Sequence, residues 1–287
     1  MLMGKQFNDI KKLQEICENE GGFHLKLNED LLKNRNPDLK DDFLYYQDEK
    51  LIGFLGMYGF GSSVEICGMV HPYFRRQHIF TELFKEMLAE AKKRQFKKII
   101  LNSPSKSLEG QLFLAQYACT YSFSEYQMQW QEKVLNRETA VQLKPSQTLD
   151  DREIEIQLDF ACFGIPEAEG RRFYQERKSN PYEQMFIIET EGEKVGKIRY
   201  SILNGEFWIY GFAVFPKFQG RGIGRKALSL IVMIGKEKGL PVFLEVEAKN
   251  KQALNLYESC GFVAYHSQDY YLWTDTKKEE DDDIIQV

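Results

Sequence analysis

The fold is decided by a stretch in the second half of the chain, Gly211-Phe-Ala-Val-Phe-Pro-Lys-Phe-Gln-Gly-Arg-Gly-Ile-Gly224. Its first residues end an aromatic and β-branched run that starts at Phe207 and predicts a strand, and Pro216 halts that strand. A glycine-rich turn follows, and apolar residues at helical spacing then continue to Lys238. The stretch therefore predicts a strand, a turn and a helix in direct succession.

An earlier stretch repeats this pattern and indicates a duplicated domain. It reads Cys67-Gly-Met-Val-His-Pro-Tyr-Phe-Arg-Arg-Gln-His-Ile-Phe80, and at an offset of 144 four pairs coincide: Val70/Val214, Pro72/Pro216, Phe74/Phe218 and Ile79/Ile223. We expect domains at 1–137 and 152–276, a polar linker over 136–151 and an acidic, disordered tail over 277–287.

In the second copy the pattern predicts further elements on both sides of the turn. They are a hairpin of Gln184–Glu189 and Lys194–Ser201, a short strand Val242–Val246, a helix from Asn250 to Cys260 and a last strand Tyr265–Trp273. Each copy thus follows the order strands, helix, strand, helix, strand.

Composition narrows the class of protein. A length of 287 residues suits two domains, and a net charge of −5 argues against a polyanionic partner such as duplex nucleic acid. Five scattered cysteines and four histidines show no metal-ligand spacing, so we expect reduced thiols and no metal. Without a signal-peptide pattern or an 18-residue apolar run, we expect a cytoplasmic protein with no membrane partner.

The turn at 219–224 has the chemistry of a phosphate site. A glycine-rich turn at a helix N-terminus presents backbone N–H groups, and Gly222 and Gly224 lack Cβ atoms that would block a pyrophosphate. Four cations flank it, Lys217, Arg221, Arg225 and Lys226. The spacing fits neither the P-loop nor the dinucleotide motif. The alternative interpretation is an ordinary strand–helix turn with surface cations.

These residues resemble a known family. Gln219-x-x-Gly-x-Gly224 resembles the coenzyme A pyrophosphate motif of the GNAT superfamily of acyl-CoA-dependent N-acetyltransferases. The stretch from Leu244 to Phe262, LEVEAKNKQALNLYESCGF, is similar to that family's later strand and helix, particularly in bacterial enzymes that acetylate ribosomal-protein N-termini. The resemblance implies an α/β (α+β) fold of two tandem GNAT-like domains, each a mixed, mostly antiparallel sheet flanked by helices.

The same resemblance implies an activity and a set of cofactor contacts. The enzyme would move an acetyl group from acetyl-CoA, its co-substrate, to a primary amine by direct attack in a ternary complex. Backbone groups of Phe212, Ala213 and Val214 would bind the pantetheine arm, with Gly211 as a bulge before them. The turn residues Gln219, Gly220, Arg221, Gly222, Ile223, Gly224 and Arg225 would hold the pyrophosphate. Asn250 would lie near the cofactor arm, or act simply as a helix N-cap.

Two residues are the candidates for catalysis. Tyr257 matches the family's tyrosine that protonates the departing thiolate, although its position on the helix also suits packing against the sheet. Glu245 matches the base of the ribosomal-protein enzymes. Glu247 shares its strand face, and Glu206 and Tyr210 are outside candidates, because many relatives carry a Glu near the position of Ile209. Solvated strand carboxylates are the alternative.

The first copy keeps the apolar frame and loses the chemistry. Arg76, His78 and Phe80 replace the three glycines of the turn, and alignment on Phe123 puts Ala118 at the position of Tyr257. Glu65 is retained near the position where many relatives carry their base. We expect this copy to be structural or to shape the acceptor pocket.

The sequence leaves the acceptor open. It is a small molecule or a peptide N-terminus, with the stretch 161–182 expected as a loop at its rim, and the protein is a monomer or a homodimer. The competing hypothesis is a non-catalytic acyl-CoA-binding or sensor protein.

Overall fold

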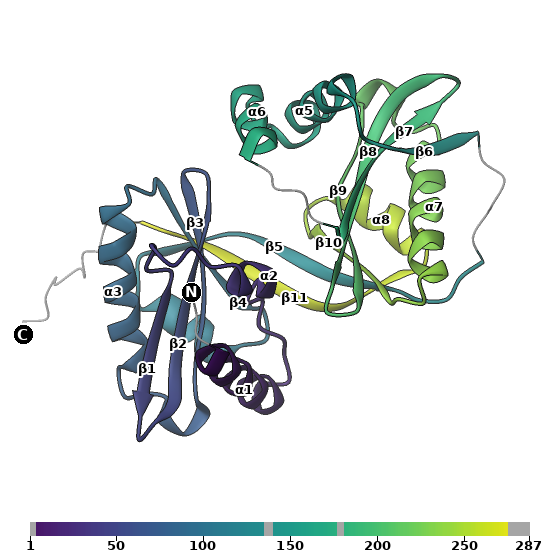
Figure 1. Ribbon diagram of the computed structural model, residues 1–287. Helices are drawn as coiled ribbons and strands as arrows, with labels where there is room; N and C mark the ends of the chain where they lie inside the picture. The colour runs from purple at the N-terminus through teal and green to yellow at the C-terminus, as the bar shows by residue number, and fades with distance from the viewer. Residues whose placement is uncertain (1–3, 135–139, 177–180, 275–287) are drawn as a thin grey trace, which may run out of the picture. The chain divides into compact units, whose positions relative to one another are not determined.

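The computed structural model describes residues 4–134, 140–176 and 181–274. They divide into two compact units: unit 1 contains residues up to 125 and from 266 onward, and unit 2 contains residues 126–265. Figure 1 labels the elements of both.

Unit 1 is built on a mixed sheet. Its antiparallel strands are β1 (Asp42–Gln47), β2 (Lys50–Phe60) and β3 (Ser63–Val70); β4 (Lys98–Pro104) runs parallel to β3, and the end of β11 (Phe262–Trp273) is antiparallel to β4. Helices α1 (Gly4–Gly21) and α2 (Glu29–Lys33) share one core, and α3 (Ile79–Lys93) and α4 (Leu108–Ala115) share a second. Figure 1 shows α1 and α3 on opposite sides of the strands. The longer helices α1 and α3 each bury one apolar stripe, such as Leu83 and Met87 of α3.

Unit 2 repeats this plan. Strands β6 (Val141–Pro145), β7 (Glu183–Thr190), β8 (Glu193–Leu203) and β9 (Glu206–Val214) are antiparallel neighbours, and β10 (Val242–Glu247) is parallel to β9. Helices α7 (Ile223–Glu237) and α8 (Lys251–Ser259) form the main core with the sheet, while α5 (Leu149–Phe163) packs on β8 and β9 beside α6 (Glu167–Glu176). The predicted fold class, a mixed and mostly antiparallel sheet flanked by helices in two copies, is confirmed.

The closing strands of the two copies are exchanged between the units. The strand β5 (Cys119–Trp130) belongs to unit 1 up to Glu125 and to unit 2 from Tyr126, and β11 passes from unit 2 to unit 1 after Tyr265. In unit 1 the exchanged part of β11 pairs with β4, with Tyr270 opposite Asn102. The expected boundaries at 1–137 and 152–276 follow the sequence repeat, whereas the compact units follow strand pairing.

Two segments differ from the sequence expectation. The linker interpretation of 136–151 is wrong for Val141–Pro145, which is an edge strand paired with β7, and for the start of α5, where Thr148 and Asp151 form a capping box. The stretch 161–182 is not a plain loop, because it contains α6. The expected acidic tail lies outside the described residues.

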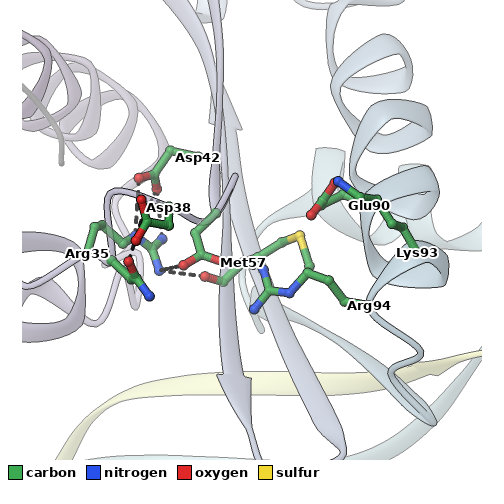
Figure 2. A network of polar contacts seen from close by, with 9 residues as sticks. Arg35, Asp38, Asp42, Met57, Glu90, Lys93 and Arg94 are labelled. Atoms are coloured by element: carbon green, nitrogen blue, oxygen red, sulfur yellow. Dashed lines mark hydrogen bonds and ion pairs between the residues drawn. The ribbon is translucent and has the colours of Figure 1, made fainter.

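A network of ion pairs and hydrogen bonds holds the segment that precedes the first strand of unit 1. Arg35 is almost buried, pairs with Asp42 at 2.7 Å and donates to the Met57 carbonyl at 2.6 Å. Figure 2 shows these residues and their contacts. Its guanidinium lies 4.5 Å from the centre of the Tyr58 ring. Burial raises the pKa of Asp42, and the nearby Arg35 charge opposes that rise. The network ties the segment before β1 to β2.

In the described part of the chain, no helix is long and apolar enough to span a membrane. The same residues contain no group of three or more His, Cys, Asp or Glu side chains arranged to hold a metal ion.

Candidate active site

The site in unit 2 begins where two parallel strands part. Strands β9 and β10 pair from Phe207 opposite Val242 to Ile209 opposite Leu244, and the pairing stops there although both strands continue. Beyond this point the edge of β9 that faced β10 leaves its backbone N–H and C=O groups for another partner. An extended ligand with amide groups is a suitable partner for such an edge.

A β-bulge lies at the point of divergence. The register between β8 and β9 shifts between two pairs, Lys197 opposite Ala213 and Arg199 opposite Tyr210. Gly211 and Phe212 of β9 therefore both lie opposite Ile198 of β8. Gly211 has φ of +55°, in the left-handed region that glycine adopts without strain. The predicted bulge at Gly211 is confirmed. It turns Phe212 toward the core formed with α7 and α8.

The glycine-rich turn places open backbone at the start of α7. Gly220 and Gly222 have φ of +74° and +77°, and no atom lies within 4 Å of a Cβ built on either. Gly222 is the N-cap of α7 and supplies no capping side chain, so the first N–H groups of this 15-residue helix keep no side-chain acceptor from the cap. Gln219 donates from Nε2 to the Val214 carbonyl at 2.8 Å, which ties the turn to the end of β9.

Gly224 has a different local role from the one expected. A Cβ at this position would lie 3.3 Å from Leu256 and 3.6 Å from Phe212. Its missing side chain therefore allows α7 to approach α8 and the bulge. The backbone N–H of Gly224 still belongs to the first turn of α7.

Tyr257 lies on α8 with its ring in the core. The side chain is 9% exposed, and its ring centre is 6.5 Å from that of Phe212 and 6.1 Å from that of Phe262. Burial raises the pKa of Tyr257 to about 12, so the hydroxyl stays protonated at neutral pH. Within the described part of the chain this hydroxyl has no hydrogen-bond partner. Asn250 is the N-cap of the same helix and accepts from the Ala253 N–H at 3.1 Å.

The candidate carboxylates lie on the other face of the sheet. Val242, Leu244 and Val246 point into the core, so alternation puts Glu245 and Glu247 on the opposite side, as predicted. Gln127 donates to Glu245 at 2.9 Å. This contact was missed by sequence reasoning, because Gln127 lies in β5 of the first copy and only strand exchange brings it into unit 2.

The other two candidates have different partners. Glu247 pairs with Lys249 at 2.6 Å, and Glu206 accepts from the indole N–H of Trp208 at 2.8 Å. Glu245 directly follows the last paired residue of β10 and so lies nearest to the divergence. Of the three carboxylates, it is the one whose position along the strand matches that of the bulge.

Unit 1 diverges in the same way without a bulge. Strands β3 and β4 pair up to Ile66 opposite Leu101, and β2 follows β3 in unbroken register. The last paired residues of the two units correspond at an offset of 143, and the residues from the bulge to the turn correspond at 144. The later helix caps Ser107 and Asn250 are again 143 apart. Glu65 therefore corresponds to Trp208, and not to Ile209 as one constant offset suggested.

The helix after the divergence corrects a second alignment. Ser107 caps α4 by accepting from Gly110, just as Asn250 caps α8 by accepting from Ala253. Counting from these caps puts Leu114, and not Ala118, at the position of Tyr257. Leu114 is a buried apolar residue, so no hydroxyl occurs at this position in unit 1.

The turn of unit 1 keeps its backbone shape but carries side chains. Arg76 and His78 have φ of +63° and +60°, close to the angles of the glycines they replace. Phe80 packs edge-on against Phe113, with ring centres 4.7 Å apart. Both phenylalanines line a cavity of about 510 Å³ that also borders Asn102.

Comparison with known proteins agrees with this repeated geometry. Residues 7–108 and 153–262 each match the acetyltransferase (GNAT) family, and together they make up more than half of the chain. The chain belongs to the GNAT acetyltransferase family. It carries two GNAT domains in tandem, and the second retains the bulge and the glycine turn.

Curated relatives of this GNAT protein are N-acetyltransferases. A mycothiol acetyltransferase of Streptomyces coelicolor is 36% identical over 115 residues, which are 37% of this chain and 36% of that protein. A [ribosomal protein bS18]-alanine N-acetyltransferase of Escherichia coli is 36% identical over 96 residues, 33% of this chain and 65% of that protein. The match thus spans about a third of one relative and less than two thirds of the other.

Solved structures share the whole GNAT fold. A GCN5-related N-acetyltransferase from Sphaerobacter thermophilus superposes with a TM-score of 0.78 at 17% identity, over 94% of this chain and 93% of that one. A tandem GNAT protein from the clavulanic acid biosynthesis pathway gives 0.70 at 12% identity, over 93% and 94%. At such identities the likeness is one of fold alone.

Proposed function

We propose that this GNAT protein transfers an acetyl group from acetyl-CoA to a primary amine at the site in unit 2. The observation that carries the proposal is the combination of an open β9 edge, the bulge at Gly211 and an uncapped helix start at Gly222. These features offer, in chain order, backbone partners for a pantetheine arm and N–H donors for a pyrophosphate.

The residues fit acetyl-CoA as a co-substrate. Backbone groups of Phe212, Ala213 and Val214 would hold the amides of the pantetheine arm beside the bulge. The amides from Gly220 to Arg225 would hold the pyrophosphate, and the exposed cations Arg221 and Arg225 add favourable charge. The Asn250 side chain caps α8 through its oxygen, which leaves its amide nitrogen available as a donor to the cofactor arm.

The chemistry is a direct attack with no covalent enzyme intermediate. The amine nitrogen bonds to the thioester carbonyl carbon, its proton passes to the Glu245 carboxylate directly or through water, and the C–S bond breaks. The departing thiolate accepts a hydrogen bond from the Tyr257 hydroxyl, which is protonated because its pKa is about 12. Glu245 and Tyr257 lie on opposite faces of the sheet, so each would reach the reacting group from its own side of the gap between β9 and β10.

We propose a non-catalytic role for unit 1. Leu114 supplies no hydroxyl, and strand β3 has no bulge. The side chains of Arg76 and His78 lie on the turn that would hold the phosphates. Arg75, which precedes them, is already paired with Glu20 and Glu109.

The deciding experiment is turnover of acetyl-CoA by the purified full-length chain, with release of free thiol recorded for a broad panel of primary amines. Acceptor-dependent thiol release, abolished in the double variant Glu245→Gln/Tyr257→Phe, is the expected result. Tight acetyl-CoA binding without turnover for any amine would contradict the proposal and favour a sensor protein.

A further inference from the structure

The sheet of unit 2 carries a continuous aromatic surface on the face opposite its α7–α8 core. Phe207, Ile209 and Leu244 point into that core, so their strand neighbours Trp208 and Phe243 point away from it. We call this surface the aromatic face; its rings are Trp208, Tyr210, Phe243 and Tyr265.

The rings of the aromatic face touch in series. Trp208 stacks on Phe243 with centres 5.0 Å apart and lies 6.3 Å from Tyr210, and Phe243 meets Tyr265 edge-on at 5.8 Å. Phe243 is 6% exposed, whereas Tyr265 is 38% exposed. The buried Phe243 ring therefore backs the half-buried Trp208 ring.

Several carboxylates lie on the same sheet as these rings, and only some of them are paired with a cationic side chain. Glu183 is paired with Arg199, and Glu247 with Lys249. Glu206 is held by a neutral donor, the indole N–H of Trp208, and has no cationic partner in the described part of the chain. Besides burial, Glu206 and Glu245 both raise the pKa of Tyr265, which places two negative charges around that one ring.

The aromatic face already binds one cation in this manner. The Arg199 guanidinium lies 5.3 Å from the centre of the Tyr210 ring, with the Glu183 carboxylate 2.8 Å from its nitrogen. A π surface backed by a carboxylate attracts cations and ammonium groups in particular. Trp208 with Glu206 offers the same pair of elements, and tryptophan is the strongest aromatic partner for a cation.

We infer that the acceptor is a primary amine carrying a second cationic group, which rests against Trp208 and Glu206 while the first amine reacts beside Glu245. The inference rests on the proposed function. Trp208 and Glu206 lie one and three residues before Ile209, and Ile209 pairs with Leu244, directly before Glu245. The distance along the strand to the level of Glu245 is therefore two and four residues, or about 7–13 Å. This range suits the spacing of the two ammonium groups in an extended aliphatic diamine or triamine.

The test compares acceptors that differ by one charge. Initial rates of acetyl transfer by the full-length chain are measured with 1,5-diaminopentane, with spermidine and with n-pentylamine. We expect kcat/KM for the diamine to exceed that for n-pentylamine by about 5- to 30-fold, the range of one cation–π contact with a nearby carboxylate. The preference should decrease at high salt.

Variants connect the preference to the aromatic face. Glu206→Gln keeps an acceptor for the Trp208 indole and removes only the charge, and Trp208→Leu removes the π surface. Each should lower the diamine-to-monoamine ratio at least threefold, mainly through KM. Glu258→Gln makes the same charge change on the exposed side of α8 and should leave the ratio unaltered.

The outcomes separate this inference from the proposed function. A ratio near one, or a ratio that Glu206→Gln and Trp208→Leu do not alter, would overturn the inference while leaving acetyl transfer intact. Faster transfer to amines with a neutral tail, or to N-termini of peptides without cationic side chains, than to the diamine would also overturn the inference. Failure of every amine would instead refute the proposed function.

Discussion

Replacing Tyr257 by Phe tests the chemistry at the departing sulfur. The buried hydroxyl has a pKa of about 12, whereas a thiol has a reference value of ~8.5. The gap of roughly 3.5 units, or about 5 kcal/mol, means that complete proton transfer from tyrosine to thiolate is unfavourable. In the proposed mechanism the hydroxyl would therefore act chiefly as a hydrogen-bond donor to a developing negative charge. Such a bond contributes ~1.5–3 kcal/mol, or about 10- to 150-fold in rate.

The assay is single-turnover acetyl transfer, because slow product release could hide the effect on kcat. Tyr257→Phe keeps the ring contacts with Phe212 and Phe262, so the melting temperature and coenzyme A affinity should remain nearly unchanged. The ratio of wild-type to variant rates should be constant from pH 6 to pH 9. Even pH 9 is about three pH units below the pKa of Tyr257, so the hydroxyl stays protonated over this whole range. Equal single-turnover rates would refute the role of Tyr257, and a ratio that falls within that pH range would refute its neutral hydroxyl.

Three further substitutions test the remaining assignments. Glu245→Gln should lower turnover by ~10²–10⁴ while acetyl-CoA affinity is kept. Glu247→Gln should lower turnover little, because the Glu247 carboxylate is already paired with Lys249. A larger loss of turnover in Glu247→Gln would show that Glu245 is not the base. Gly222→Asp should bind coenzyme A more weakly than Gly222→Asn in calorimetric titration, because both residues tolerate positive φ and differ only in charge; equal affinities would contradict a phosphate site there. Arg35→Met should destabilise unit 1 by ~3–5 kcal/mol in denaturant unfolding by leaving Asp42 buried without its partner, and a loss below 1 kcal/mol would count against the network.

Local pattern was sufficient for most elements of unit 2. The run after Gly222 became α7, the stretch around Gly192 became a hairpin, and Asn250 capped α8, because each depends on neighbours in the chain. The edge strand β6 was missed, since Val141–Pro145 is only five residues long and ends in proline. Its apolar and polar residues alternate as in a strand, but so short a run is identified as one only through its pairing with β7.

The sequence repeat could not predict the strand exchange. Aligning the two copies assumes that each closes its own sheet, but β5 and β11 each divide between the units. Gln127 was therefore not considered beside Glu245, although the two side chains are hydrogen-bonded. A sequence signal was present in the length of the two strands, which exceed the short closing strand that one small sheet requires.

One added residue accounts for much of the difference between the two copies. In β3 of unit 1 the side chains alternate without interruption, so Cys67 and Met69 fill the core beneath α1. In β9 the extra residue at Gly211 reverses the alternation midway. Residues before it present Trp208 and Tyr210 to the outer face, and Phe212 after it points inward to Tyr257. A single strand thereby supplies both the proposed recognition surface and a wall of the proposed cofactor site. No substitution of side chains on a regular strand would achieve this, because alternation fixes each face along its whole length.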